Sequence, residues 1–158
     1  MKANIYILIL VFVLIGCKKD DGSPVGPTVI ATEDWSLAMD NDTSSHGEQT
    51  LEKKSDGTVA AEGGWYFVSQ GLTLQCPFSD GTATISDTNI SMIVHGIARY
   101  PGAPAGYQTS AFTLSANGGT FHGRSSGTFS FTYSTYGWPS GKSGTFNGVR
   151  TNGNGVTN

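Results

Sequence analysis

The chain has 158 residues, with 9 Lys and Arg against 12 Asp and Glu, and its formal net charge is −3 at pH 7. Charged residues make up only 13% of the chain, and the sequence shows no basic cluster of the kind that neutralises a phosphate backbone, so we expect no nucleic-acid partner. The length suits one domain, and 2 cysteines are too few for a disulfide-stapled scaffold.

The first sixteen residues have the features of an export signal. A start with one positive side chain, Lys2, leads into an unbroken apolar run from Ile5 to Ile15. A membrane-spanning helix needs about 20 apolar residues, whereas the apolar part of a secretory signal has about 7–15. We therefore predict that residues 1–16 are a signal peptide that is removed; a retained N-terminal membrane anchor is the alternative.

The end of this run is Leu14-Ile15-Gly16-Cys17, which resembles the lipobox of bacterial lipoprotein precursors. The resemblance implies cleavage before Cys17 and attachment of acyl chains to its thiol; two or more chains give stable membrane anchoring. The following Lys18-Lys19-Asp20-Asp21 is similar to the acid-containing segment of surface-displayed Bacteroidota lipoproteins. The resemblance implies an outer-membrane location, lipid-anchored and surface-exposed. Residues 17–28 contain Pro24 and Pro27 and are predicted to be a flexible tether.

With Cys17 lipidated, Cys76 is the remaining thiol, so an intramolecular disulfide is not expected. Cys76 shares an alternating face with Leu72 and Leu74, which predicts a small, buried and unreactive side chain. A reactive or intermolecular cysteine is the alternative.

From residue 29 to residue 151 the sequence predicts an all-β domain, and residues 152–158 are predicted to be a frayed tail. Turn signals include Asp56-Gly57, Asp80-Gly81 and Asn117-Gly118-Gly119. The predicted strands are 30–39, 48–54, 58–69, 72–76, 82–86, 89–100, 108–116, 120–135 with breaks at its glycines, and 142–151. Because most connections look like hairpins between sequence neighbours, we predict a single antiparallel meander of about eight strands that closes into a barrel. A two-sheet β-sandwich is the alternative.

The strongest strand pattern covers residues 89–100. One face carries Ile90, Met92, Val94 and Ala98, and the other carries Ile93, His95, Ile97 and Arg99. We interpret His95 as a semi-buried histidine with satisfied hydrogen bonds; a pocket-lining histidine is the alternative.

The sequence holds no recognisable catalytic motif. It has no G-x-S-x-G elbow and no spaced histidine pair, although a carboxylate pair assembled by the fold stays open at this stage. The polar stretch from Asp40 to Glu48 could offer oxygen ligands to Ca²⁺, but it lacks the EF-hand pattern and fits ordinary turn chemistry equally well. We predict that the protein is not an enzyme, with no catalytic residue, no cofactor and no metal site.

Aromatic residues in two connections are the candidate ligand-binding residues: Tyr100, Tyr107, Tyr136 and Trp138. Exposed rings stack on sugars or form protein interfaces; the alternative is that they plug the barrel ends. We predict a monomeric, non-catalytic binding module for a glycan or a small apolar ligand held in the barrel mouth. The alternative is a structural or interaction subunit of an outer-membrane complex. An open pocket of about 300 Å³ or more favours a ligand, and a filled barrel favours an interaction role. The overall pattern resembles a small Bacteroidota lipoprotein with a lipocalin-like or other calycin-like barrel.

Overall fold

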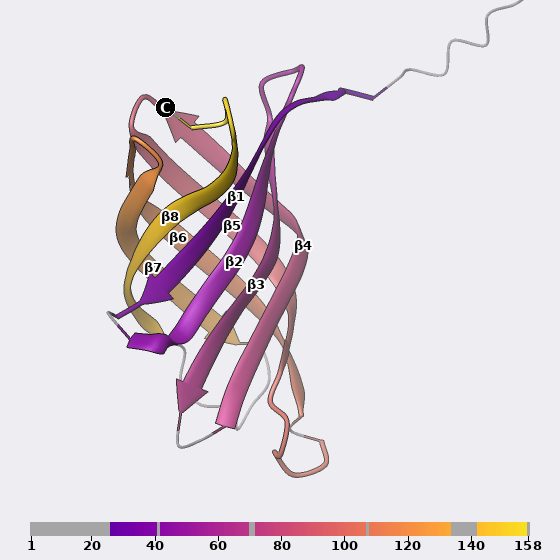
Figure 1. Ribbon diagram of the computed structural model, residues 1–158. Coiled ribbons are helices and arrows are strands. Elements are labelled where there is room, and N and C mark those ends of the chain that lie inside the picture. Colours follow the sequence, from indigo (N-terminus) through magenta and orange to yellow (C-terminus); the bar gives the residue numbers. More distant parts are fainter. Residues whose placement is uncertain (1–25, 41, 70–71, 107, 134–141, 158) are drawn as a thin grey trace, which may run out of the picture.

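The computed structural model describes residues 26–40, 42–69, 72–106, 108–133 and 142–157. Eight strands form one closed antiparallel barrel in which each strand pairs with its sequence neighbours and β1 pairs with β8 (Figure 1). The strands are β1 (Val29–Met39), β2 (Asp42–Lys54), β3 (Val59–Ser69), β4 (Leu72–Ser86), β5 (Asn89–Arg99), β6 (Thr109–Phe121), β7 (Arg124–Tyr133) and β8 (Ser143–Asn154). The predicted meander that closes into a barrel is confirmed. No helix in the described ranges is long and apolar enough to cross a membrane.

The topology gives the barrel two different ends. The start of β1 and the C-terminal residues lie at one end of the barrel (Figure 1). The β2–β3, β4–β5 and β6–β7 connections lie at the same end. We call this the tether end, because residues 17–28 precede it in sequence. The β1–β2, β3–β4, β5–β6 and β7–β8 connections lie at the opposite, far end.

The interior is filled by aromatic and aliphatic side chains. Trp65 lies 5.3 Å from Phe129 and 5.8 Å from Phe131 between ring centroids, and Phe67 lies 4.9 Å from Phe131. These edge-to-face contacts join β3 to β7 across the barrel and are favoured for aromatic pairs. The indole nitrogen of Trp65 donates a hydrogen bond to Gln49 Oε1 at 3.3 Å. An eight-stranded barrel is just wide enough for side chains to fill it, and this one is filled.

The alternation predicted for residues 89–100 is confirmed on its inward face, where Met92, Val94 and Ala98 are buried. The burial predicted for His95 is wrong, because its side chain is exposed on the outer face, but it does have a hydrogen-bond partner: its Nδ1 lies 3.1 Å from Thr113 Oγ1. The neighbours Ile93 and Ile97 are about half exposed, at 48% and 51%. The outer surface of β5 has no covering layer among the described residues, so this face meets solvent.

The burial predicted for Cys76 is confirmed, and the residue is a free cysteine. Burial raises the pKa of its thiol to about 12, against a smaller opposing effect of the hydrogen bond with Tyr133. The thiol is therefore protonated at neutral pH and unreactive, because the thiolate is the nucleophile.

Several strand boundaries differ from the prediction. Asp80-Gly81 is not a hairpin turn but part of an irregularity inside β4, where the register with β5 shifts between Phe78 and Thr82. Gly118 lies within β6 opposite Gly127 of β7, and the chain turns instead at His122-Gly123. Asp-Gly and Gly-Gly pairs suit bulges and close strand approaches as well as turns, so local composition alone does not separate these outcomes. The Asp56-Gly57 turn is confirmed, with Thr58 N–H donating to Asp56 Oδ1 at 2.9 Å.

The predicted frayed tail is wrong for the described residues up to 157. Asn152 and Asn154 pair with Asp34 and Thr32 as the last part of β8. Val156 and Thr157 are buried. The physical reason is a buried carboxylate, Glu33, which binds this segment and which the sequence reading did not use.

Candidate functional site

The barrel interior has no space for a ligand within the described ranges. Its cavity has a volume of about 20 Å³ and is lined by residues that include Trp35, Leu51, Trp65 and Phe146. A cavity of that size has room for about one water molecule, whereas ligand pockets occupy about 300–1,000 Å³. Binding of a small apolar molecule inside the barrel would therefore require the aromatic core to rearrange.

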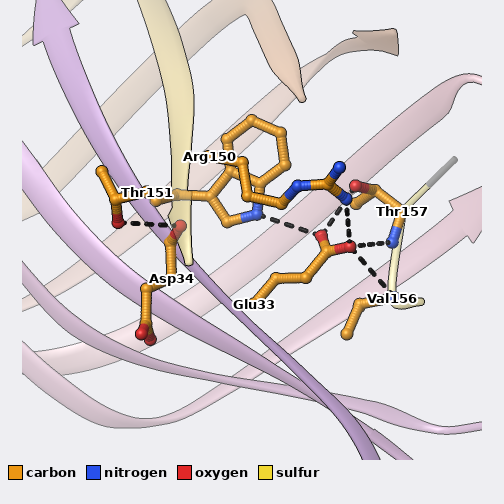
Figure 2. Close-up of polar contacts among 7 residues, drawn as sticks. Glu33, Asp34, Arg150, Thr151, Val156 and Thr157 are labelled. Atoms are coloured by element: carbon orange, nitrogen blue, oxygen red, sulfur yellow. Dashed lines mark hydrogen bonds and ion pairs between the residues drawn. The ribbon is translucent and has the colours of Figure 1, made fainter. Parts of the chain in front are cut away.

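A buried carboxylate lies at the tether end. Glu33 is fully buried on the inward face of β1 and accepts hydrogen bonds from three parts of the chain (Figure 2). Arg150 Nη1 donates to Oε1 at 2.7 Å, and Thr157 Oγ1 donates to Oε2 at 2.7 Å. The backbone N–H groups of Val156 and Thr157 each donate to Oε1 at 3.2 Å. Trp35 Nε1 donates to Oε2, also at 3.2 Å. We call this group the Glu33 latch.

The electrostatics of the latch explain why a charge is tolerated there. Burial by itself raises the pKa of Glu33, but the hydrogen bonds from Thr157, Arg150 and Val156 together outweigh it and lower the pKa below its usual value. The carboxylate is thus ionised at neutral pH and its oxygens are occupied. It has the character of a structural tie and not of a catalytic acid. The sequence did carry a signal for it, because Glu33 shares the alternating face of Trp35, Leu37 and Met39.

The predicted aromatic site falls mostly outside the described residues. This applies to Tyr107, Tyr136 and Trp138, and also to the predicted lipidation site Cys17. Tyr100 is half-buried where β5 ends, and its N–H donates to the carbonyl of Gln108 at 2.9 Å. The topology places the β5–β6 and β7–β8 connections at the same far end of the barrel.

The polar stretch from Asp40 to Glu48 is not a loop beyond its first residues, because β2 begins at Asp42. Asp40 Oδ1 accepts the N–H of Thr145 at 2.7 Å, so this carboxylate links the first connection to β8. His46 stacks on Tyr66 with ring centroids 4.9 Å apart. The described residues contain no group of three or more His, Cys, Asp or Glu side chains that could hold a metal ion.

A groove of about 840 Å³ lies on the outer surface of the barrel and crosses β2, β1, β8, β7 and β6. Two rows of outward-facing side chains, aligned by the strand registers, line it. The first row is His46, Ala38, Asn147, Ser126 and Gly119, and the second is Ser36, Val149, Arg124 and Phe121. We call this feature the outer groove. His46 ends the first row on β2, and Phe121 ends the second row on β6.

The β6–β7 hairpin presents the largest side chains of the outer groove. His122 and Gly123 both have positive φ, 47° and 73°, as a two-residue hairpin turn of this kind requires. The turn sets Phe121 directly opposite Arg124. It is held in place by hydrogen bonds from Arg150 N–H to the Gly123 carbonyl at 2.8 Å and from Thr120 N–H to the Thr88 carbonyl at 2.6 Å.

The outer groove is open to solvent, its lining presents more apolar than polar surface, and Phe121 lies at its rim. Phe121 is 67% exposed and Val149 is 52% exposed, both unusually high for large apolar residues. Arg124 has no hydrogen-bond or ion-pair partner among the residues that the structure describes. Sequence reading missed this site because its residues come from five strands. The outward aromatic Phe121 beside the His-Gly turn was the available local signal.

Together these features define an up-and-down antiparallel β-barrel whose middle is packed and whose surface carries hollows of about 840, 650 and 570 Å³. Comparison with protein-family models, with curated proteins and with solved structures returns no match for this chain. The chemistry of the outer groove and of the barrel ends is therefore the basis for a functional proposal.

Proposed function

We propose that this chain is a lipid-anchored, non-catalytic binding module that takes a glycan on the outside of its barrel. The observation that carries the proposal is the contrast between an interior cavity of about 20 Å³ and an outer groove of about 840 Å³. The outer groove lies within the range of ligand sites, as do two other surface hollows of about 650 and 570 Å³, and the interior cavity lies far below it. Of the two ligand classes expected from the sequence, this distribution of space favours the glycan over the small apolar molecule.

The lining of the outer groove suits a sugar. A pyranose ring has an apolar face that stacks on an aromatic ring, and Phe121 offers such a ring to solvent. Its edges carry hydroxyl groups that bond to neutral polar side chains. Ser126 supplies one on β7 next to Phe121, and Ser36 supplies another three strands away, within reach of a longer oligosaccharide. Open grooves of this type keep bridging water without loss of affinity.

The anchor would act at the tether end. In this proposal Cys17 carries the acyl chains, and residues 17–28 connect it to Val29, where β1 begins. A flexible chain of that length spans about 20 Å on average, which keeps the barrel close to the membrane surface. Replacing Cys17 with Ser should release the protein from the membrane fraction and abolish its labelling by a fatty-acid analogue; a labelled, membrane-bound variant would overturn the anchor.

Two sets of variants separate the outer groove from the predicted aromatic loops. The purified lipoprotein in detergent is applied to a glycan array as wild type, as Phe121→Ala, and as the double variant Tyr107→Ala with Trp138→Ala. We expect Phe121→Ala to lose the bound glycans, because it removes the stacking surface. Loss in the double variant alone would move the site to the far end. An array with no bound glycan at all would overturn the proposed function.

The exposed apolar face of β5 favours a second candidate function, that of an interaction subunit. Ile93 and Ile97 are both about half exposed and lie four residues apart on the outward face of β5, on either side of His95, with Ala111 of β6 opposite Ile97. Exposed apolar groups that adjoin one another mark protein-interaction surfaces. Replacing both isoleucines with Ser should abolish co-purification with one specific envelope protein, and unchanged recovery of that protein would exclude this face.

A further inference from the structure

We propose that the outer groove selects sugars that carry a carboxylate, with Arg124 binding the carboxylate and Phe121 stacking on the same sugar ring. This inference rests on the proposed glycan-binding function and names the class of glycan. The ligand class is an oligosaccharide that contains hexuronic acid units.

First, the Arg124 side chain has no partner among the described residues. Arg124 begins β7 with an exposed side chain, and no described side chain or carbonyl accepts a hydrogen bond from it. A guanidinium has five N–H donors in a planar fork that matches a carboxylate in bidentate fashion. Arg150, the neighbouring arginine on β8 at the tether end, is already paired with Glu33. Arg124 is therefore the guanidinium that is available to a ligand.

The second argument is the charge of the lining. The described residues that line the outer groove include Arg124 and His46 but no Asp or Glu, although the chain as a whole carries a net charge of −3. Two carboxylates adjoin the lining without belonging to it: Glu48 pairs with Ser36 on the neighbouring strand, and Asp87 directly precedes Thr88. The groove lining is thus basic although the protein as a whole is acidic. A concave surface strengthens the positive potential of such a lining.

The third argument is the spacing of the two groups. Phe121 and Arg124 are directly opposite each other on antiparallel strands, where Cβ atoms lie about 4.5–5.5 Å apart. A hexuronic acid bears its carboxylate on the rim of the pyranose ring. One sugar unit can therefore place its apolar face on the Phe121 ring while its carboxylate reaches the Arg124 guanidinium. The fixed turn at His122-Gly123 holds the two side chains on one rigid hairpin.

The test compares two ligands with the same sugar backbone, tetragalacturonic acid with ionised carboxylates and its neutral methyl ester. Titration calorimetry with the lipoprotein in detergent should give at least tenfold tighter binding of the acid. Because one charge-assisted contact is removed, Arg124→Gln should weaken binding of the acid about tenfold and leave binding of the ester unchanged. Phe121→Ala should weaken both ligands. Arg99→Gln is the matched control, since Arg99 is an exposed arginine of β5 that does not line the outer groove.

Two further arms identify what is recognised. A hexaglutamate peptide and free acetate carry the carboxylate without the sugar, and both should bind more weakly than the tetrasaccharide. Equal affinity for the peptide or for acetate would overturn the assignment to a sugar. An acid affinity no higher than that of the ester, or an unchanged affinity in Arg124→Gln, would overturn the anion selectivity. If anion selectivity is overturned but the ester binds and Phe121→Ala abolishes that binding, the proposed glycan-binding function still holds.

Discussion

Arg150 and Arg124 lie on adjacent strands near the tether end, yet they belong to opposite sides of the barrel wall. Arg150 points inward to the buried carboxylate of Glu33, with 2.7 Å between Nη1 and Oε1. Arg124 is exposed at the rim of the outer groove and has no partner among the described residues. Val149, which pairs with Arg124, directly precedes Arg150 and faces outward. The two-residue period of β8 thus separates the structural contact of Arg150 from the proposed ligand-binding face in a single residue step.

The comparison teaches which charge supports the fold and which is free to act on a ligand. A buried carboxylate with all its oxygens bonded is destabilising to remove, because its donors are left unpaired in the interior. An exposed, unpaired guanidinium contributes little to stability. Substitutions at the two sites should therefore separate stability from binding.

The largest effect is expected at Glu33. Glu33→Ala leaves Arg150, Thr157 and Trp35 without their acceptor and should lower the free energy of unfolding by about 3–5 kcal/mol. Urea denaturation followed by tryptophan fluorescence measures the change. Glu62→Gln, on the exposed side of β3, is the control and should stay within about 0.5 kcal/mol of wild type. A loss at Glu33 below about 1 kcal/mol would contradict the structural role of the latch.

Acid should weaken the same interaction without any mutation. The pKa of Glu33 is lowered in the folded protein, so the ionised form contributes stability above the ordinary pKa of 4.5. That contribution is lost as the pH falls from 4.5 towards the lower folded value. Urea midpoints measured from neutral pH into this range should decline more steeply in wild type than in Glu33→Gln. Parallel curves would show that Glu33 does not contribute to acid sensitivity.

A smaller effect on stability is expected at Thr157, which contributes two of the hydrogen bonds in the Glu33 latch. Thr157→Val keeps the backbone N–H bond to Glu33 and removes the hydroxyl bond of 2.7 Å. One hydrogen bond to a charged group is worth about 1.5–3 kcal/mol, and the added methyl group offsets part of this. Hydrogen exchange of the β8 amides should increase along with the loss in stability, because the tail closes over the end of that strand. Unchanged exchange would mean that the tail is not held by this bond.

The smallest effect on stability is expected at Arg124. Arg124→Gln should change the free energy of unfolding by less than about 0.5 kcal/mol, because no described residue loses a partner. Thermal unfolding in the absence of glycan measures this. A clear destabilisation would mean that Arg124 has a structural role, and the contrast with Arg150 would then fail.

The architecture was accessible from the sequence because alternation and turn signals are local. The inward set Met92, Val94 and Ala98 follows from the period of two, and the Asp56-Gly57 hairpin follows from its turn chemistry. The errors at Asp80-Gly81 and at Asn117-Gly118-Gly119 arise because the same residue types serve bulges and turns, and tertiary pairing decides between them. The lipid anchor at Cys17 stays a prediction.

The candidate sites were less accessible, because they depend on which strands become neighbours. Ser36 and Val149 line one groove only because β1 pairs with β8 at that register. The role of Glu33 likewise requires a tail that reads locally as a flexible, glycine-rich end. Neither pairing leaves a signature within a window of a few residues, so a single sequence does not reveal them.

Closure of the barrel has a consequence for how the chain folds. The ion pair between Glu33 and Arg150 joins residues 117 positions apart, and the β1–β8 seam joins the first strand to the last. The seam therefore cannot form until nearly the whole chain is present, and contacts of such long sequence separation form slowly. Until then β1 keeps an unpaired edge. The barrel therefore closes only after β8 has been synthesised, whichever of the other strand pairs form before it.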